Sequence, residues 1–175
     1  MRRRQGPGAR LKSIGYQIFY RLPARVRRRL VRLVAPTYTV GAVVLVRDQS
    51  GRLLLLRQPP GYGWSLPSGL VDRGEAPVQC AVRELAEETG VRVKPEDLSP
   101  ATPNAVLHPR GRWIDFVFEV QVDSNAHTVQ VDGGEVLEAK WHGEHNLPPL
   151  TVPTARLLAT FGLGPLRSYP EATQR

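Results

Sequence analysis

The chain has 175 residues, a length that suggests one domain with a full hydrophobic core. Its one cysteine, Cys80, excludes an internal disulfide framework and is typical of a reducing, cytoplasmic setting, and no apolar run is long enough to predict a membrane span. The net charge of +8 conceals a split, because residues 1–34 hold ten Arg, one Lys and no acid, whereas residues 35–175 hold 13 basic and 16 acidic residues. A nucleic-acid-binding core is therefore not indicated.

The basic N-terminal segment, residues 1–35, is expected to be partly helical and partly disordered. The composition of residues 1–10 is typical of disorder. Residues 11–34 are a weak helical candidate, since Pro23 suits a first helical turn and Pro36 ends the pattern. Apolar residues recur there at helical spacing among arginines: Val26, Leu30, Leu33 and Val34. No signal peptide is predicted.

Three roles for this segment stay open. It is interpreted as a helix packed on the domain core, as an amphipathic helix on the surface of an acidic membrane, or as an arm that contacts nucleic-acid phosphates. Association with a membrane surface through residues 1–34 is thus one of the hypotheses that the sequence raises.

The central region, residues 36–164, mixes strand and helix signals. Residues 37–46 are rich in β-branched side chains and predict a buried strand, and residues 52–58 predict a second strand antiparallel to the first. A loop dense in Pro and Gly follows at residues 59–69, and a helix is predicted from about Pro77 to Thr89.

Further strands are predicted downstream of this helix. Residues 102–122 hold one or two strands with a turn at 109–111, and residues 114–120 carry the clearest strand pattern. Shorter strands are expected within residues 127–135 and 138–143, a final helix from about Pro153, and a loose tail over residues 165–175. Strands mixed with two principal helices predict an α/β or α+β fold.

The predicted helix carries an unusual cluster of acids. Glu84, Glu87 and Glu88 share one face, where like charges repel by about 0.2–0.5 kcal/mol per pair. Gly90 is a natural C′ residue, so the three carboxylates lie at the negative end of the helix dipole. Several oxygen ligands are what Mg²⁺ prefers, and a bound cation would convert the repulsion into attraction. The alternative interpretation is a solvated charged face.

The segment from Gly69 to Val91, GLVDRGEAPVQCAVRELAEETGV, resembles the Nudix box. All fixed positions of that motif are filled: Gly69, Glu75, Arg83, Glu84, Leu85, Glu87, Glu88, Gly90 and Val91. One departure is Ser68, where the family often has a first glycine. The resemblance implies a Nudix-like α/β/α sandwich with a mixed β-sheet over residues 36–164.

The resemblance also implies an activity. Nudix enzymes are hydrolases that use Mg²⁺ or Mn²⁺ to cleave the diphosphate bond of a nucleoside diphosphate linked to another group. A nucleotide, an oxidised nucleotide and a nucleotide sugar all stay open as the substrate. The alternative hypothesis is a non-catalytic Nudix-fold module that binds nucleotides or regulates a partner, and a homodimer is compatible with either.

By the same resemblance, Glu84, Glu87 and Glu88 are metal ligands, one of them serves as general base, and the backbone carbonyl of Gly69 contacts a metal. Arg83 belongs to the catalytic set and is expected to orient Glu87 or to pair with Glu75.

The resemblance gives the other candidates lesser roles. Glu75 is interpreted as structural, because it locks the loop to the helix. Glu135 is the better candidate for a further metal ligand, whereas Glu138 is expected to be an exposed strand residue.

Candidates for substrate binding come from the strand ends and loops. Arg57 and Arg112 could clamp phosphate or be surface charges, and Trp64 could stack on a base or pack in the core. Cys80 is expected to be a packing residue rather than a nucleophile. The four histidines show no spacing typical of a metal site.

Overall fold

The computed structural model describes residues 7–108, 112–127, 129–131 and 133–168, with side chains from residue 12 onward. The chain divides into two compact units, Met1–Thr37 and Tyr38–Arg175. In the described part of the chain, no helix combines the length and the apolar character needed to cross a membrane.

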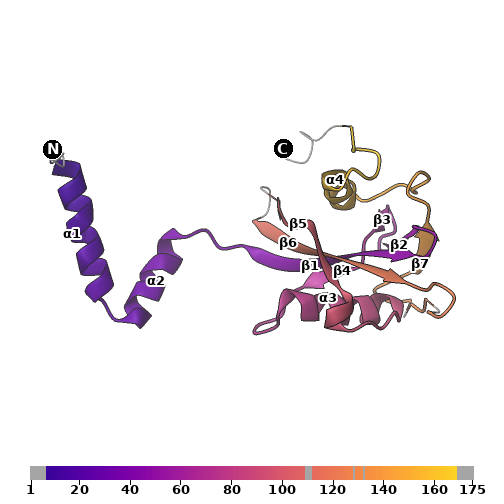
Figure 1. The fold of residues 1–175 in the computed structure, drawn as a ribbon, viewed down its shortest axis with the longest axis horizontal. Helices are drawn as coiled ribbons and strands as arrows, with labels where there is room; N and C mark the ends of the chain where they lie inside the picture. Colours follow the sequence, from indigo (N-terminus) through magenta and orange to yellow (C-terminus); the bar gives the residue numbers. More distant parts are fainter. Residues whose placement is uncertain (1–6, 109–111, 128, 132, 169–175) are drawn as a thin grey trace. The chain divides into compact units, whose positions relative to one another are not determined.

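The first unit contains two helices, α1 (Pro7–Arg21) and α2 (Ala24–Val34) (Figure 1). Residues 7–10 lie in α1, so the prediction of disorder is wrong for these four residues. The predicted single helical stretch is broken at residues 22–23, because Pro23 disfavours helical backbone at the residue before it and has no N–H to donate. Pro23 instead forms the N-cap of α2.

The second unit is built on one mixed sheet of seven strands in the order β3-β2-β1-β6-β5, with β4 pairing with β1 and β7 with β2 (Figure 1). The strands are β1 (Thr39–Asp48), β2 (Leu53–Arg57), β3 (Trp64–Ser65), β4 (Ser68–Leu70), β5 (Ser99–His108), β6 (Trp113–Val122) and β7 (Glu138–His142). The β1–β6 pair is parallel and the other pairs are antiparallel, which confirms the predicted orientation of the first two strands.

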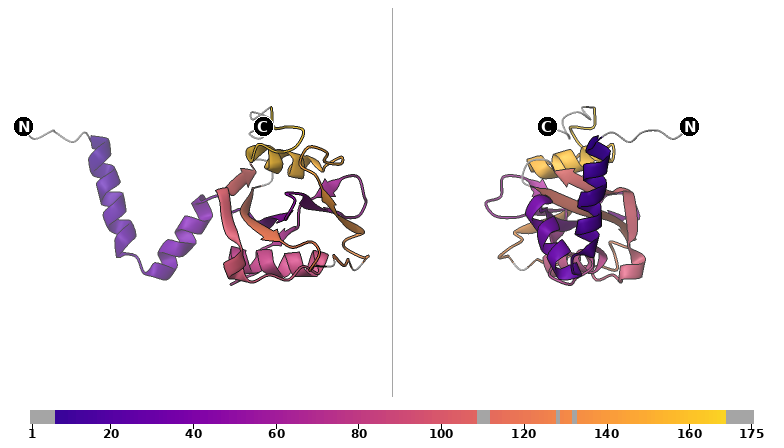
Figure 2. Two further views of the ribbon diagram at one scale, coloured as in Figure 1. Left: turned by 45° about the vertical axis from the view of Figure 1, so that its right-hand side comes forward. Right: turned by 90° about the vertical axis from the view of Figure 1, so that its left-hand side faces the viewer.

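The helices α3 (Pro77–Thr89) and α4 (Val152–Thr160) cover opposite faces of this sheet (Figure 2). Strand β1 is buried on both faces, since Val44 belongs to the apolar cluster under α3 and Leu45 to the cluster under α4. Alternation of side chains along a strand sends successive residues to opposite layers. The predicted sandwich with a mixed sheet is therefore confirmed.

Two predicted features of the loops differ from the structure. The loop at residues 59–69 contains the short strands β3 and β4, and a 3₁₀ turn (Pro95–Asp97) precedes β5. The short strand expected within residues 127–135 is absent from the described residues of that range. Gln130 N donates instead to Thr89 O at the end of α3, at 2.9 Å, so this segment pairs with the helix terminus and not with the sheet. The predicted turn at 109–111 and residues 169–175 of the tail lie outside the described residues.

Candidate functional site

The site is positioned by α3, whose two ends are fixed by local sequence. Pro77 occupies the first helical position, and the side chain of Gln79 accepts a hydrogen bond from Ala76 N at 3.0 Å. Gly90 ends the helix in the left-handed conformation, with φ +74°. Cys80, Ala81 and Leu85 are buried against the sheet, so the acids of the last turn lie at the border between core and solvent.

Glu84 packs directly over Gly69 of the neighbouring strand β4. A Cβ atom at Gly69 would stand 1.9 Å from the carboxyl carbon of Glu84, so only glycine fits here. Burial raises the pKa of Glu84, and the guanidinium of Arg83 opposes that shift. The carboxylate is thus held beside the backbone of the loop before α3.

Glu88 is the most buried of the three acids, with 7% of its surface exposed. Its Oε2 accepts a hydrogen bond from Ser68 N at 2.9 Å, and its Oε1 accepts one from Gln58 Nε2 at 2.7 Å. Burial raises the pKa of Glu88 to about 8, and the charges of Glu84 and Glu135 contribute to the rise. Because the bond from position 68 comes from the backbone, serine in place of the usual glycine preserves it.

Arg83 connects three of the acids. Its guanidinium binds both oxygens of Glu75 at 3.0 Å, Glu84 at 2.7 Å and Glu87 at 3.2 Å. These contacts raise the pKa of Arg83 and lower the pKa of Glu75. Glu75 also accepts a hydrogen bond from Asp72 N at 3.0 Å. The structure therefore contains both contacts expected of Arg83, and Glu75 joins the loop to the helix.

The positions of these acids determine whether they can bind a metal ion. Among the residues that the structure describes, no three His, Cys, Asp or Glu side chains converge closely enough to hold an ion in their present positions. Arg83 engages Glu84 and Glu87, and the side chain of Glu87 is 62% exposed. The donor set nevertheless fits a hard cation, since the buried carboxylate of Glu88 and the partly buried carboxylate of Glu84 repel one another, and both hydrogen-bond donors to Glu88 are uncharged.

The two downstream acids have different surroundings. Glu135 lies close enough to Glu88 for its charge to raise the pKa of that residue. Glu138, in β7, pairs with Arg57 at 2.9 Å and with Lys140. Of these two acids, Glu135 is the one whose charge acts on Glu88, and its role as a metal ligand stays a prediction. Glu138 is a paired residue of the sheet rather than the exposed strand residue that was expected.

The three candidate substrate-binding residues occupy two places. Arg57 and Trp64 are cross-strand partners in the β2–β3 pair, and the ring of Trp64 packs on the apolar cluster under α4 and meets His142 edge-on at 4.7 Å. Arg112 is exposed just before β6, in the left-handed region with φ 53°, and its carbonyl accepts a hydrogen bond from Thr39 N. The structure does not bring Arg112 together with the other two.

Sequence reasoning missed two side chains near the acids. Gln58, the residue after β2, holds Glu88 and itself accepts a hydrogen bond from Ser65 Oγ at 3.3 Å. Asp115, in β6, lies 2.5 Å from the point where a Cβ at Gly41 would stand, and the Gly69 carbonyl oxygen lies 3.3 Å from the same point. The only signal for Asp115 was an acid within an apolar strand pattern.

Asp115 is held in place by its neighbours. Trp113 Nε1 donates to Asp115 Oδ1, and His108 Nε2 lies 2.9 Å from Asp115 Oδ2. Because Gly41 has no side chain, the carboxylate of Asp115 can approach the backbone of β4 at Gly69.

A hollow of about 450 Å³ opens beside Gln58. Its lining includes Tyr62, Ser65, Leu150, Thr151 and Pro153. The side chain of Tyr62 is 90% exposed, and the hollow falls in the size range of small-molecule pockets, about 300–1,000 Å³. Because Gln58 contacts both, the hollow and the carboxylate of Glu88 are neighbours.

Comparisons with known proteins agree with this geometry. The family model described as the NUDIX domain matches residues 37–161. A Bacillus subtilis protein named "Putative 8-oxo-dGTP diphosphatase" is 30% identical over 119 residues, which cover 68% of this chain and 76% of that protein. The CMP-5'-(N-acetyl-N-hydroxy-3-aminopropyl)phosphonate hydrolase of Streptomyces rubellomurinus is 30% identical over 148 residues, 74% of this chain and 67% of that enzyme.

A solved structure has the same architecture. The MutT NUDIX hydrolase of Burkholderia pseudomallei superimposes with a TM-score of 0.51 and 25% identity, over 68% of this chain and 94% of that one.

Proposed function

Because this chain belongs to the NUDIX domain family, we propose that it is a metal-dependent pyrophosphohydrolase that cleaves the diphosphate of a nucleoside diphosphate linked to another group. One observation carries the proposal: Glu84 and Glu88 are held with raised pKa values beside the loop at Gly69. Perturbed carboxylates that converge next to a hollow are typical of catalytic sites.

The residues that would hold Mg²⁺ or Mn²⁺ are the carboxylates of the last turn of α3 and the loop that packs on them. Glu84, Glu87 and Glu88 would supply oxygens, with Glu135 and the Gly69 carbonyl as further ligands. A bound divalent ion polarises phosphoryl oxygens and lowers the pKa of a bound water.

The other contributions come from the protein itself. Gln58 and the amide of Ser68 fix both oxygens of Glu88, which keeps that carboxylate at one orientation. Glu87, which is exposed, would turn from Arg83 to the ion, whereas Arg83 would retain its bidentate contact with Glu75. One of the three glutamates accepts the proton of the attacking water.

The nucleotide class of the substrate is supported by the relatives, one of which is named for 8-oxo-dGTP and another for a CMP-linked phosphonate. We place the part of the substrate beyond the diphosphate in the hollow beside Gln58, where Tyr62 offers an exposed ring for stacking. Arg57, which ends β2 next to this hollow, would contact phosphate after release from Glu138. Arg112 is the weaker candidate for a phosphate contact, because the structure does not bring it together with Arg57. The single buried thiol supports a cytoplasmic setting.

Product analysis tests the function. The protein would be incubated with Mg²⁺ or Mn²⁺ and a panel of nucleotides, oxidised nucleotides and nucleotide sugars, and phosphate-bearing products would be identified. Glu87→Gln is expected to lower turnover on the order of 10²-fold or more, because it removes a metal ligand. Glu96→Gln, a change at an exposed acid in the 3₁₀ turn Pro95–Asp97 and outside the proposed ligand set, is the matched control.

The alternative, a module that binds nucleotides without cleaving them, makes a different prediction. Persistent absence of products from folded protein that still binds a nucleotide would overturn the hydrolase assignment and leave the binding module as the better description.

A further inference from the structure

The N-terminal unit carries a strong separation of charge and apolar surface that the proposed reaction does not use. At 100° per residue, Arg25, Arg28, Arg29 and Arg32 fall on one side of α2, and Val26, Leu30, Leu33 and Val34 fall on the other. Residues 1–34 hold eleven basic residues and no acid, so no intrinsic counter-charge is available within this stretch.

The apolar side of α2 is exposed, most of all at its C-terminal end. Leu33 is 81% exposed and Val34 is 85% exposed, against 40% for Val26 and Leu30, and none of the residues of α2 is buried. Scattered exposed aliphatic residues need no explanation, but four on one face of a short helix form a continuous apolar strip. Such a strip gains free energy when another apolar phase covers it.

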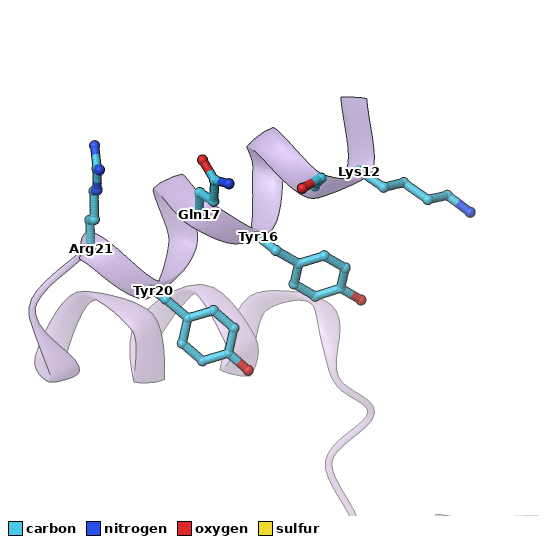
Figure 3. A pocket seen from close by; sticks show the side chains of 6 residues that line it. Lys12, Tyr16, Gln17, Tyr20 and Arg21 are labelled. Carbon is cyan, nitrogen blue, oxygen red and sulfur yellow. The ribbon is translucent and has the colours of Figure 1, made fainter. Parts of the chain in front are cut away.

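Helix α1 adds aromatic and aliphatic surface of the same kind. Ile14 and Ile18 lie one turn apart, and both are more than half exposed. Tyr16 and Tyr20 extend from the same side of α1, whereas Arg21 points away from them (Figure 3). Tyrosine has an apolar ring and a polar tip, which suits the boundary between lipid and water.

A basic side chain and two aromatic side chains are in contact where α1 is followed by α2. The guanidinium carbon of Arg27 lies 5.6 Å from the centre of the Tyr20 ring, and Phe19 meets that ring edge-on at 5.6 Å. The contact between Arg27 and Tyr20 links the end of α1 to the start of α2, so the exposed surfaces of both helices belong to one unit.

We propose that residues 7–34 form a peripheral anchor that binds the surface of an anionic lipid bilayer. The apolar strip of α2 would enter the region between headgroups and acyl chains, and the arginines would contact lipid phosphates while their stems stay along the interface. Neither helix is long and apolar enough to cross the bilayer, so the binding is interfacial. The anchor would hold the hydrolase domain at the membrane surface.

Two features favour lipid over nucleic acid as the anionic partner. An arm that contacts nucleic-acid phosphates needs the arginines alone, whereas lipid also uses Val26, Leu30, Leu33 and Val34. Four of the five arginines of α2 lie apart from the apolar strip, Arg27 being the exception at its edge, and this separation matches an interface that is charged on one side and apolar on the other.

Vesicle co-sedimentation of the full chain tests the proposal, with vesicles of phosphatidylcholine alone and of phosphatidylcholine mixed with phosphatidylglycerol. Binding is expected only with the anionic vesicles and should weaken in high salt. The double variant Leu30→Glu/Leu33→Glu should bind on the order of tenfold more weakly or worse, because carboxylates replace the apolar strip. Arg28→Gln/Arg32→Gln should weaken binding several-fold, whereas Arg92→Gln/Arg167→Gln, which removes the same charge elsewhere, should leave it unchanged.

Four results would overturn the anchor. The first is a wild-type chain that stays in the supernatant with anionic vesicles. The second is Leu30→Glu/Leu33→Glu binding vesicles as tightly as wild type. The third is equal binding of duplex DNA by wild type and by this variant when neither binds vesicles, which would identify a nucleic-acid arm. The fourth is a lower melting temperature of Leu30→Glu/Leu33→Glu without lipid, which would mean that the protein itself covers the strip. None of these results depends on whether the hydrolase domain turns over a nucleotide.

Discussion

The carboxyl group of Glu84 occupies the space that a side chain at Gly69 would fill. A Cβ built at Gly69 would stand 1.9 Å from Cδ of Glu84, and Gly69 itself pairs with Ala42 of β1. The acidic face of α3 and the strand β4 before it are therefore in contact at Gly69, where the carboxyl group of Glu84 lies against the backbone of the sheet.

Gly69→Ala is expected to displace Glu84 from this position and to lower kcat about 10- to 100-fold, because a metal ligand would lose its orientation. The measurement is turnover at saturating Mg²⁺, with thermal unfolding as a check on folding. Gly143→Ala, at a glycine with no atom within 4 Å of its added Cβ, is the control and should keep full activity. Equal activity of the two variants would contradict a role for the contact between Gly69 and Glu84.

Gln58 is expected to set the affinity for metal through Glu88. Gln58→Leu removes the 2.7 Å hydrogen bond to Glu88 Oε1 without removing a proposed ligand. The concentration of Mg²⁺ at half-maximal activity should rise about 10- to 100-fold, a typical cost of losing such a support. Gln121→Leu, at an exposed position of β6, is the matched control. A metal dependence that is the same in both variants would show that Gln58 does not position the carboxylate.

The raised pKa of Glu88 predicts a pH-dependent stability in metal-free solution. The pKa is about 8 in the folded protein, against an ordinary value of 4.5, so the folded state binds the proton more tightly than the unfolded chain does. The contribution of Glu88 to the free energy of unfolding is therefore largest below pH 4.5, and it falls as the pH rises to about 8.

Glu88→Gln removes this titration. Melting temperatures measured in the presence of a chelator should therefore show the variant gaining on wild type across the window from pH 4.5 to about 8. A constant difference between the two proteins over that range would refute the assignment. Addition of Mg²⁺ to wild type should release protons, since the ligand must be ionised to bind.

Cys80 is expected to be inert in the folded protein. It is buried, and burial, together with the charges of Glu75 and Glu84, raises the pKa of its thiol to about 12. At pH 8 the reactive thiolate would be on the order of 10⁻⁴ of the population. A thiol-specific chromogenic reagent should label the native chain very slowly and should label one thiol per chain in denaturant. Fast labelling of folded protein would contradict the burial of Cys80.

The sequence by itself determined the elements whose signals are local. Pro77 and Gly90 mark the ends of α3 because one suits the first helical turn and the other adopts a positive φ, and the structure begins and ends the helix at those signals. The acid face of α3 follows from the helical repeat alone. The strand patterns of β1 and β6 were also readable, since apolar residues in strands record which faces are buried.

Only the tertiary structure decided which groups surround the acids. Gln58 reaches Glu88 across thirty residues of chain, and Asp115 approaches Gly69 because β1 pairs with β4 on one side and with β6 on the other. Local periodicity carries no information on such pairings, because they depend on strand order and register.

The ion-pair partners and the pKa values of the charged residues were the least predictable part of the site. An arginine has several acids within reach in the sequence, and the choice of Glu75 as the bidentate partner of Arg83, or of Glu138 for Arg57, follows from the loop and from cross-strand register. The pKa values of Glu84 and Glu88 likewise depend on how deeply each carboxylate is buried. That burial is set by the packing of α3 on the sheet and cannot be read from the order of residues.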